Sequence, residues 1–265
     1  MKKIYLAMLS ILTWVSPSVN AQSSTDKAND NTVTFYIARH GKTMFNTLDR
    51  VQGWSDSPLT PAGIEVAEYL GKGLKEIPFK AAYSSDLSRA RQTARIVLEA
   101  KGQKELPVIE VPGVRETNFG RYEGGFNTDM WGDAALYMHY KNGNDLMKDI
   151  AGKPDMFQKI LAAIKKLDTL NMAEDYNDVK KRGQQALREI AEKEASQGGG
   201  NILLVSHGMA ISIFLFELDS AGKKPEVGQM ENAAVSKVVY KNGQFTLESF
   251  GDMRYVEKGK ALSGK

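Results

Sequence analysis

The chain has 265 residues, with 35 Lys and Arg against 32 Asp and Glu and a formal net charge of +3. This length favours one domain with decorations, and the mixed, only mildly basic charge does not indicate a nucleic-acid surface. Because the chain contains no cysteine, a thiol nucleophile, a disulfide framework and a Cys-ligated metal are excluded.

Residues 1–21 have the pattern of a secretory signal peptide. The basic start MKK precedes the apolar run IYLAMLSILTWV, which is short for a bilayer span, and Ala21 is the small residue that signal peptidase prefers. We therefore expect export to a periplasm or out of the cell, with a retained N-terminal anchor as the alternative. The small polar residues of 22–31 are expected to form a flexible leader.

From residue 32 onward, segments typical of strands alternate with segments typical of helices. A run of β-branched and aromatic residues predicts a buried strand at 32–38. The apolar spacing of 59–74 predicts a helix, with Thr60 as its N-cap and Pro61 in its first turn. The alternation continues with a strand at 80–85, a helix at 86–100 and a strand at 106–112.

Residues 120–177 interrupt this pattern. They are rich in aromatic residues and Met and are broken by glycines, which favours short helices and a cap insertion. The alternation then resumes with a helix at 176–196, a strand at 201–208, a helix at 209–218 and a hairpin turning at Asn242 and Gly243. The polar tail at 253–265 is expected to fray.

This order of elements predicts an α/β fold for residues 32–252. We expect a three-layer sandwich with a mostly parallel sheet, helices on both faces and a helical cap insertion. In such sheets ligands bind beyond the carboxyl ends of the strands. The side chains that follow strand ends are Arg39, His40, Ser84, Ser85, Arg89, Arg115, Glu116, Ser206 and His207.

Two guanidinium groups and two imidazoles at one sheet edge suit a phosphoryl group. Arg39 and Arg89 can each donate paired hydrogen bonds to phosphate oxygens, and their charges keep a neighbouring imidazole neutral. A neutral histidine can attack phosphorus and form a covalent intermediate. Glu116 is placed to protonate the leaving oxygen if its surroundings keep it protonated. No cluster of Asp and Glu indicates a metal, and no cofactor is expected.

Five stretches of the sequence resemble motifs of the histidine phosphatase superfamily, which includes cofactor-dependent phosphoglycerate mutases and many phosphatases. They occur in the family's order, and together they are far more specific than any one alone. The stretches are RHGKTMFN (39–46), QGWSDSPLTPAG (52–63), SSDLSRARQTA (84–94), RETNFGRYEG (115–124) and VSHG (205–208).

The resemblance implies a role for each matching residue. His40 would become phosphohistidine, and Glu116 would be the proton donor. Asn46 would also touch the phosphate. The residues implied to hold the phosphoryl group are Arg39, Arg89 and His207. The fold implied is a mostly parallel sheet flanked by helices, with an insertion over the site.

Four further residues allow two interpretations each. Glu123 lies close to Glu116 in the same loop and is the alternative proton donor. Gln52 and Gly53 either line the substrate pocket or belong to a purely structural loop. His139, in the insertion, is expected to have a packing or surface role rather than to contact substrate.

The favoured function is an exported, metal-independent phosphomonoester hydrolase acting on a small phosphorylated substrate. The first alternative is a phosphoglycerate mutase, against which export argues, because a glycolytic step and its bisphosphate primer belong in the cytoplasm. The second is a non-catalytic phosphate-binding protein, which would not need a nucleophile and a proton donor together. We expect no nucleic-acid partner, no stable membrane association after signal cleavage, and a homodimer as a possible assembly.

The sequence also departs from another branch of the superfamily. Phytases and acid phosphatases usually carry a further arginine soon after Arg-His-Gly and a His-Asp pair late in the chain. Here the corresponding stretches read RHGKTMFN and SHGM. The sequence therefore resembles the mutase-like branch, with specificity expected to reside in the insertion.

Overall fold

The computed structural model describes residues 31–150, 153–219, 221–222 and 230–264. The expected signal peptide at 1–21 and all of the expected leader except Asn31 lie outside the described residues. Within the described ranges, no helix is both long and apolar enough to cross a membrane.

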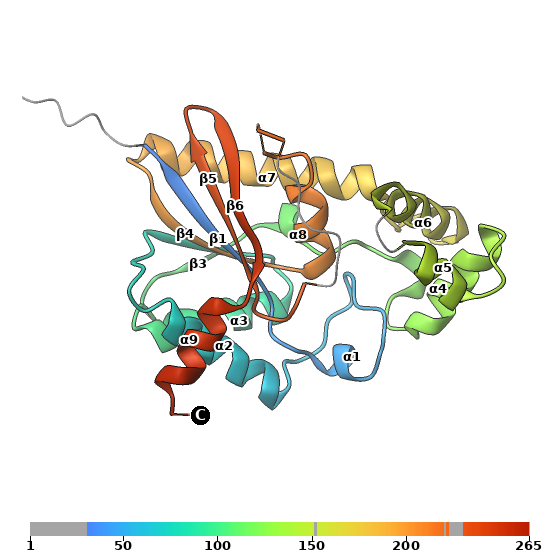
Figure 1. The fold of residues 1–265 in the computed structure, drawn as a ribbon, viewed down its shortest axis with the longest axis horizontal. Coiled ribbons are helices and arrows are strands. Elements are labelled where there is room, and N and C mark those ends of the chain that lie inside the picture. Colours follow the sequence, from blue (N-terminus) through green and yellow to red (C-terminus); the bar gives the residue numbers. More distant parts are fainter. Residues whose placement is uncertain (1–30, 151–152, 220, 223–229, 265) are drawn as a thin grey trace, which may run out of the picture.

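The described strands form one mixed, six-stranded sheet (Figure 1). The first four strands in spatial order are parallel to one another, and the last two form a hairpin that pairs antiparallel with its neighbour. In spatial order the strands are β3 (Val108–Glu110), β2 (Ala81–Ser84), β4 (Gly200–Ser206), β1 (Val33–Arg39), β5 (Val235–Lys241) and β6 (Gln244–Asp252).

The β5–β6 hairpin confirms the turn predicted from the sequence. Its two turn residues, Asn242 and Gly243, have φ angles of 53° and 80°. A type I′ turn requires positive φ at both central positions, and Asn and Gly adopt it at the lowest cost. Because β5 pairs with β1, the hairpin extends the main sheet beyond β1.

Helices cover both faces of the sheet (Figure 1). Strand β1 shows the two faces, because its alternate side chains enter different cores. Phe35 and Ile37 pack on the side of α7 and α8, whereas Tyr36 and Ala38 pack on the side of α2, α3 and α9. The helices are α2 (Pro61–Gly73), α3 (Ser88–Lys101), α7 (Tyr176–Ser196), α8 (Gly208–Leu215) and α9 (Arg254–Leu262). The predicted α/β fold with helices on both faces is confirmed.

Three helices of the predicted insertion lie to one side of the sheet, near one end of α7 (Figure 1). They are α4 (Asn127–Tyr137), α5 (Gly143–Ile150) and α6 (Pro154–Leu167). Met130, Leu146 and Ile160, one from each helix, are buried and belong to the core on the α7 side of the sheet. We call α4 to α6 the cap; it shares a core with the sheet domain instead of forming a separate one.

The C-terminal segment differs from the sequence-based expectation of a fraying polar tail. Residues 254–262 form helix α9, which packs against α2, with Val256 and Gly259 buried. The two helices approach closely because glycines face each other: a Cβ on Gly259 would lie 1.7 Å from the backbone oxygen of Tyr69, and one on Gly73 would lie 1.8 Å from that of Tyr255. The prediction was wrong because the close approach of α9 to α2 depends on glycines, which an apolar pattern in the sequence does not indicate.

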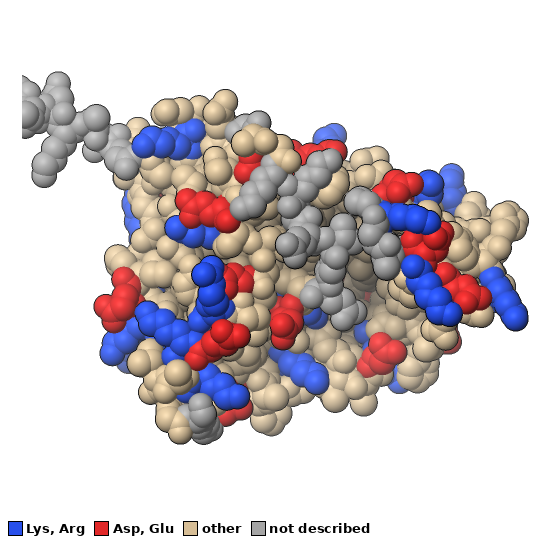
Figure 2. All heavy atoms as spheres, viewed as in Figure 1, with Lys and Arg blue, Asp and Glu red and all other residues tan. Residues whose placement is uncertain are grey.

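Charged side chains of both signs are interspersed on the face of the molecule seen in Figure 2. Many form exposed pairs, including Lys153 with Asp149 and Lys159 with Asp155 on the cap. Such exposed pairs contribute little stability, roughly 0 to 1 kcal/mol each.

Candidate active site

The two histidines of the predicted site lie side by side at the centre of the sheet. His40 follows β1 and His207 follows β4, and these parallel strands are neighbours, with Arg39 in register with Ser206. The His40 amide donates to the Ser206 carbonyl over 3.0 Å. The two ring centroids are 5.1 Å apart, and both residues are buried. Adjacent strand ends therefore fix the spacing of the two imidazoles.

The hydrogen bonds of the His40 ring assign its protonation. Nδ1 lies 2.8 Å from the Gly41 carbonyl oxygen, and because that oxygen only accepts, Nδ1 carries the proton. Nε2 then has the lone pair and accepts from Arg89 Nε over 3.3 Å. Burial, followed by the charges of Arg89 and Arg39, holds the pKa of His40 well below its usual range. His40 is thus a neutral imidazole whose Nε2 faces the site.

Arg89, in the first turn of α3, is fully buried and held by the loop 52–57. Its Nη2 donates to the Gly53 carbonyl over 2.7 Å, and its Nη1 donates to the Ser55 carbonyl and to Asp56 Oδ1 over 3.1 and 3.0 Å. A guanidinium with this many fixed contacts has little freedom to move. The loop therefore presents Arg89 to His40 in one orientation.

Glu123 in turn holds the loop 52–57. Its two carboxylate oxygens accept four backbone N–H groups, from Gly53, Trp54, Ser55 and Phe119, over 2.8 to 3.1 Å. A carboxylate has about four acceptor positions, so this set occupies all of them. That geometry suits a structural anchor of the loop, and it does not suit the alternative assignment of Glu123 as the proton donor.

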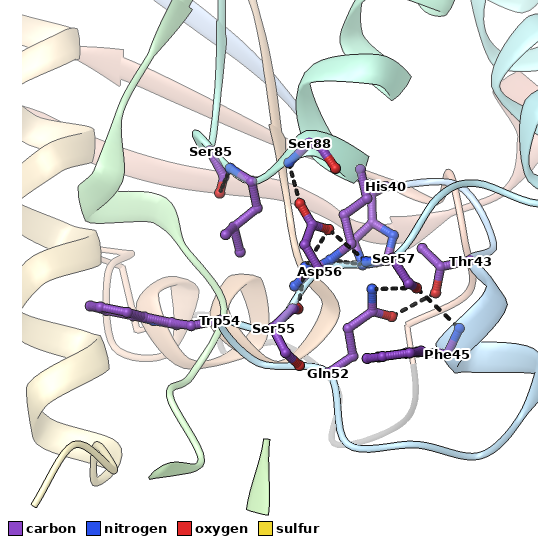
Figure 3. Close-up of polar contacts among 12 residues, drawn as sticks. His40, Thr43, Phe45, Gln52, Trp54, Ser55, Asp56, Ser57, Ser85 and Ser88 are labelled. Carbon is purple, nitrogen blue, oxygen red and sulfur yellow. Dashed lines mark hydrogen bonds and ion pairs between the residues drawn. The ribbon is translucent and has the colours of Figure 1, made fainter. Parts of the chain in front are cut away.

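Gln52 and Asn46 connect the loop to the start of α1 (Met44–Thr47). Gln52 Oε1 accepts from the Thr43 hydroxyl over 2.6 Å, and Gln52 Nε2 donates to Ser57 over 3.1 Å (Figure 3). Gln52 Oε1 also accepts from Asn46 Nδ2 over 3.4 Å. Asn46 Oδ1 also accepts from the Thr43 amide, which completes a capping box for α1. Both side chains are engaged in the framework of the site.

Gly53 occupies a position where no side chain fits. A Cβ there would lie 2.1 Å from the Thr117 carbonyl oxygen and 2.2 Å from Glu123 Oε1. The glycine thus lets the loop 52–57 approach the segment that carries Glu116. This contact supports the structural interpretation of Gly53, and its carbonyl also binds Arg89.

Glu116 lies against the N-terminus of α8. Oε1 accepts from the amides of Thr117 and Ala210 over 2.9 and 2.8 Å, and Oε2 accepts from that of Met209 over 3.2 Å. Burial is the largest influence on its pKa and raises it, although these N–H groups and the charge of Arg89 act in the opposite direction. A buried carboxyl with a raised pKa beside two arginines can hold a proton for transfer.

Several buried polar atoms at this edge have no hydrogen-bond partner among the described residues. They include Arg39 Nε and both ring nitrogens of His207. An unpaired buried polar group costs about 1–3 kcal/mol, so such groups mark a place where a polar ligand binds. Burial, and then the charge of Arg89, also lowers the pKa of His207 well below its usual range. Together with Arg89, these groups suit an anion with several oxygens.

Three of the residues that shape the site were not singled out from the sequence: Thr43, Ser57 and Arg182. The hydroxyl of Thr43 and that of Ser57 bind Gln52, and Arg182 donates to the backbone that carries Glu116. Thr43 lies two residues after the Arg-His-Gly stretch and Ser57 lies within the quoted stretch 52–63, whereas nothing local marks Arg182. Among the described residues, no group of three or more His, Asp or Glu side chains is placed to hold a metal ion.

Comparison with known proteins gives matches over nearly the whole described chain. The profile of the histidine phosphatase superfamily (branch 1) matches residues 35–145 and 139–253. A crystal structure of phosphoglycerate mutase from Bacillus anthracis str. Sterne has 42% identity and a TM-score of 0.78, and the match covers 88% of this chain and 98% of that one.

Two phosphatases are more distant relatives. The metal-independent phosphoserine phosphatase of Arabidopsis thaliana is 25% identical over 248 residues, 92% of each chain. The phosphoserine phosphatase of Entamoeba histolytica, solved with 3-phosphoglyceric acid, is 25% identical with a TM-score of 0.61, and the match covers 84% of this chain and 99% of that one. Sheet order, strand-end histidines and these matches agree, and the chain belongs to the histidine phosphatase superfamily, branch 1, among phosphatase and mutase relatives.

Proposed function

We propose that this protein is an exported phosphomonoester hydrolase that works through a phosphohistidine on His40 and requires no metal. The observation that carries the proposal is the His40 ring, a neutral imidazole with Nδ1 bound to the Gly41 carbonyl and Nε2 directed at Arg89. Around it, Arg39 Nε and the His207 nitrogens have no partner among the described residues. A neutral nucleophile surrounded by anion-binding groups fits phosphoryl transfer.

In the first step, His40 Nε2 forms a bond to phosphorus while the bond from phosphorus to the ester oxygen breaks. The electron pair goes to that oxygen, and Glu116 protonates it. Arg39, Arg89 and His207 bind the phosphoryl oxygens and stabilise their charge. Because the bound dianion adds negative charge beside Glu116, it raises the pKa of that carboxyl further and favours the protonated donor.

In the second step, water attacks phosphorus and the phosphorus–nitrogen bond breaks, so the electron pair returns to Nε2. Glu116, now ionised, accepts a proton from the attacking water. Inorganic phosphate leaves, and both residues regain their starting states. The same carboxyl thus acts first as acid and then as base.

Two features support the remaining parts of the proposal. Arg39 and Arg89 supply the positive charge that Mg²⁺ supplies in other phosphotransferases, and one relative is named a metal-independent phosphoserine phosphatase. The signal-peptide pattern of residues 1–21 supports export.

Phosphate release from 4-nitrophenyl phosphate by residues 22–265, measured in chelator, tests this function. We expect wild type to turn over and His40→Asn to lose at least about 1,000-fold in kcat, as removal of a nucleophile does. His139→Asn is the matched control. His139 is exposed on the cap and has a φ of 64°, which Asn tolerates, and we expect its activity within about twofold of wild type.

A mutase is the second candidate, because the B. anthracis protein with 42% identity is named a phosphoglycerate mutase. The two functions differ in what accepts the phosphoryl group from His40. With 3-phosphoglycerate and a bisphosphorylated primer, the hydrolase releases inorganic phosphate. Transfer of the phosphoryl group between substrate hydroxyls, without release of inorganic phosphate, would indicate a mutase instead of a hydrolase. Tight phosphate binding without either product would indicate a binding protein.

A further inference from the structure

Arg182, on α7, is fully hydrogen-bonded by residues around the predicted proton donor. Its Nε and Nη2 bind the two carboxylate oxygens of Glu174 over 2.7 and 2.8 Å. Its other bonds go to three backbone carbonyls: Gly113 over 3.0 Å, Arg115 over 2.8 Å and Glu116 over 2.8 Å. A guanidinium has five N–H donors, and here each one has an acceptor.

These bonds fix the main chain of Glu116. Its carbonyl accepts both from Arg182 Nη2 and from Trp54 Nε1, the latter over 3.0 Å. The Arg182 and Glu174 side chains are only 19% and 16% exposed. A shielded, two-pronged pair of this kind holds its geometry better than an exposed single contact. The Glu116 backbone is therefore clamped from the α7 side while its carboxyl reaches the N-terminus of α8.

Glu174, which follows the last cap helix α6, also binds the segment that carries Glu116. Its carboxylate accepts from the Asn118 amide over 3.0 Å, and its own amide donates to the Asn118 carbonyl over 2.8 Å. Nearby, Asp168, directly after α6, accepts from the amide of Arg121 over 2.8 Å. The segment that follows the cap helices and the segment that carries Glu116 are thus joined at two points.

We propose that Arg182, held by Glu174, is a positioning residue for proton transfer by Glu116. The inference rests on the proposed hydrolase function and adds the group that sets the donor in place. Proton transfer to the leaving oxygen requires hydrogen-bond distance, and a displacement of about 1 Å can cost about 100-fold in rate. Loss of the clamp therefore impairs the step that needs an acid and leaves the attack by His40 largely intact.

Two substrates separate these steps. The leaving group of 4-nitrophenyl phosphate is a stable phenolate that needs little acid catalysis. The leaving group of benzyl phosphate is a strongly basic alkoxide. In Arg182→Gln, we expect kcat/KM for benzyl phosphate to fall about 10- to 100-fold and that for 4-nitrophenyl phosphate to fall less than about threefold. In a Glu116→Gln background, adding Arg182→Gln should cause no further loss with benzyl phosphate, because the donor is already absent.

Arg188→Gln is the matched control. It lies on the same helix, is exposed, and contacts the Phe245 ring rather than the segment that carries Glu116. We expect it to leave the ratio of the two kcat/KM values unchanged. If Arg182→Gln does not fold by circular dichroism, Glu174→Gln carries the test, because it keeps an acceptor for Arg182 but removes the charge. For Glu174→Gln we expect a smaller loss in the same direction. Arg182→Lys should retain more of the benzyl phosphate activity than Arg182→Gln does.

The outcomes separate the two proposals. Wild type that hydrolyses neither substrate overturns the hydrolase function and the positioning role with it. Active wild type, combined with equal losses for both substrates in the folded Arg182→Gln or Glu174→Gln variant, overturns the positioning role alone. Additive losses of Arg182→Gln and Glu116→Gln with benzyl phosphate do the same.

Discussion

At the scale of single residues, Glu123 determines the shape of the loop that holds Arg89. Its carboxylate accepts from the amides of Gly53 and Ser55, and the carbonyls of these same two residues accept from Arg89. The orientation of Arg89 therefore depends on a carboxylate that does not bind it directly. Glu116, by contrast, is proposed to act directly on the leaving group.

Glu123→Gln tests this arrangement. An amide offers one oxygen and places an NH₂ group against backbone donors, so about two of the four N–H groups lose their acceptor. We expect kcat/KM to fall about 10-fold for 4-nitrophenyl and benzyl phosphate alike, with weaker inhibition by inorganic phosphate. Glu110→Gln changes one partner of an exposed pair with Arg91, and its kcat/KM should stay within about twofold of wild type. Loss confined to benzyl phosphate would instead return Glu123 to the acid role.

The residues expected to carry the chemistry stand out in the sequence because each lies at a strand end or a few residues after one, within a distinctive stretch. His40 and His207 follow apolar strands directly, and Arg89 opens a helix. Arg182 could not be predicted, because its acceptor Glu116 lies 66 residues away and the contact exists only once α7 packs beside it. Asn46 and Gln52 were singled out from the sequence. Their hydrogen bonds could not be predicted, because the folded loops bring Thr43 and Ser57 to them.

At the scale of elements, the sequence predicts best where local pattern and packing agree. Helix α2 begins as expected, with Thr60 as its cap and Pro61 as its first residue, because capping chemistry is local. Strand β3 is shorter than predicted, Val108–Glu110, because Pro107 and Pro112 on either side cannot donate to the sheet. Helix α9 was not predicted, because its close approach to α2 depends on glycines in both helices.

The α2–α9 contact predicts opposite effects for one substitution at two helical glycines. Gly259→Ala places a Cβ against the backbone of Tyr69, so we expect the free energy of unfolding to fall by about 1–3 kcal/mol. Gly132→Ala, within α4, meets nothing within 4 Å and should be neutral or stabilising by up to about 1 kcal/mol. Urea unfolding measures both. Similar effects of the two variants would show that the close approach of α9 does not contribute to stability.

At the scale of the whole molecule, the two buried histidines make stability depend on pH. Burial, and then neighbouring arginine charge, lowers the pKa of both His40 and His207 below the usual 6.5. The folded state keeps both neutral while the unfolded state protonates them, so unfolding takes up protons below about pH 6.5. The stabilisation is therefore complete above pH 6.5 and is lost as the pH falls. Glu116, with its pKa raised above 4.5, acts in the opposite direction near that value.

Urea unfolding between pH 7.5 and 5.5 measures this effect. We expect the free energy of unfolding to decrease below pH 6.5 by up to about 1.4 kcal/mol per pH unit for each histidine. His40→Asn should reduce that slope by the share of one histidine. A flat profile in wild type would mean that the two imidazoles protonate as readily in the folded protein as in the unfolded chain.

In the proposed mechanism, His40 itself carries the phosphoryl group. Rapid mixing of wild type with 4-nitrophenyl phosphate, an alkaline quench that preserves phosphohistidine, and peptide mapping by mass spectrometry test it most directly. We expect a phosphorylated peptide that contains His40, formed in wild type and absent from His40→Asn. A phosphoryl group on His207, or turnover with no phosphorylated protein at any time, would contradict this expectation.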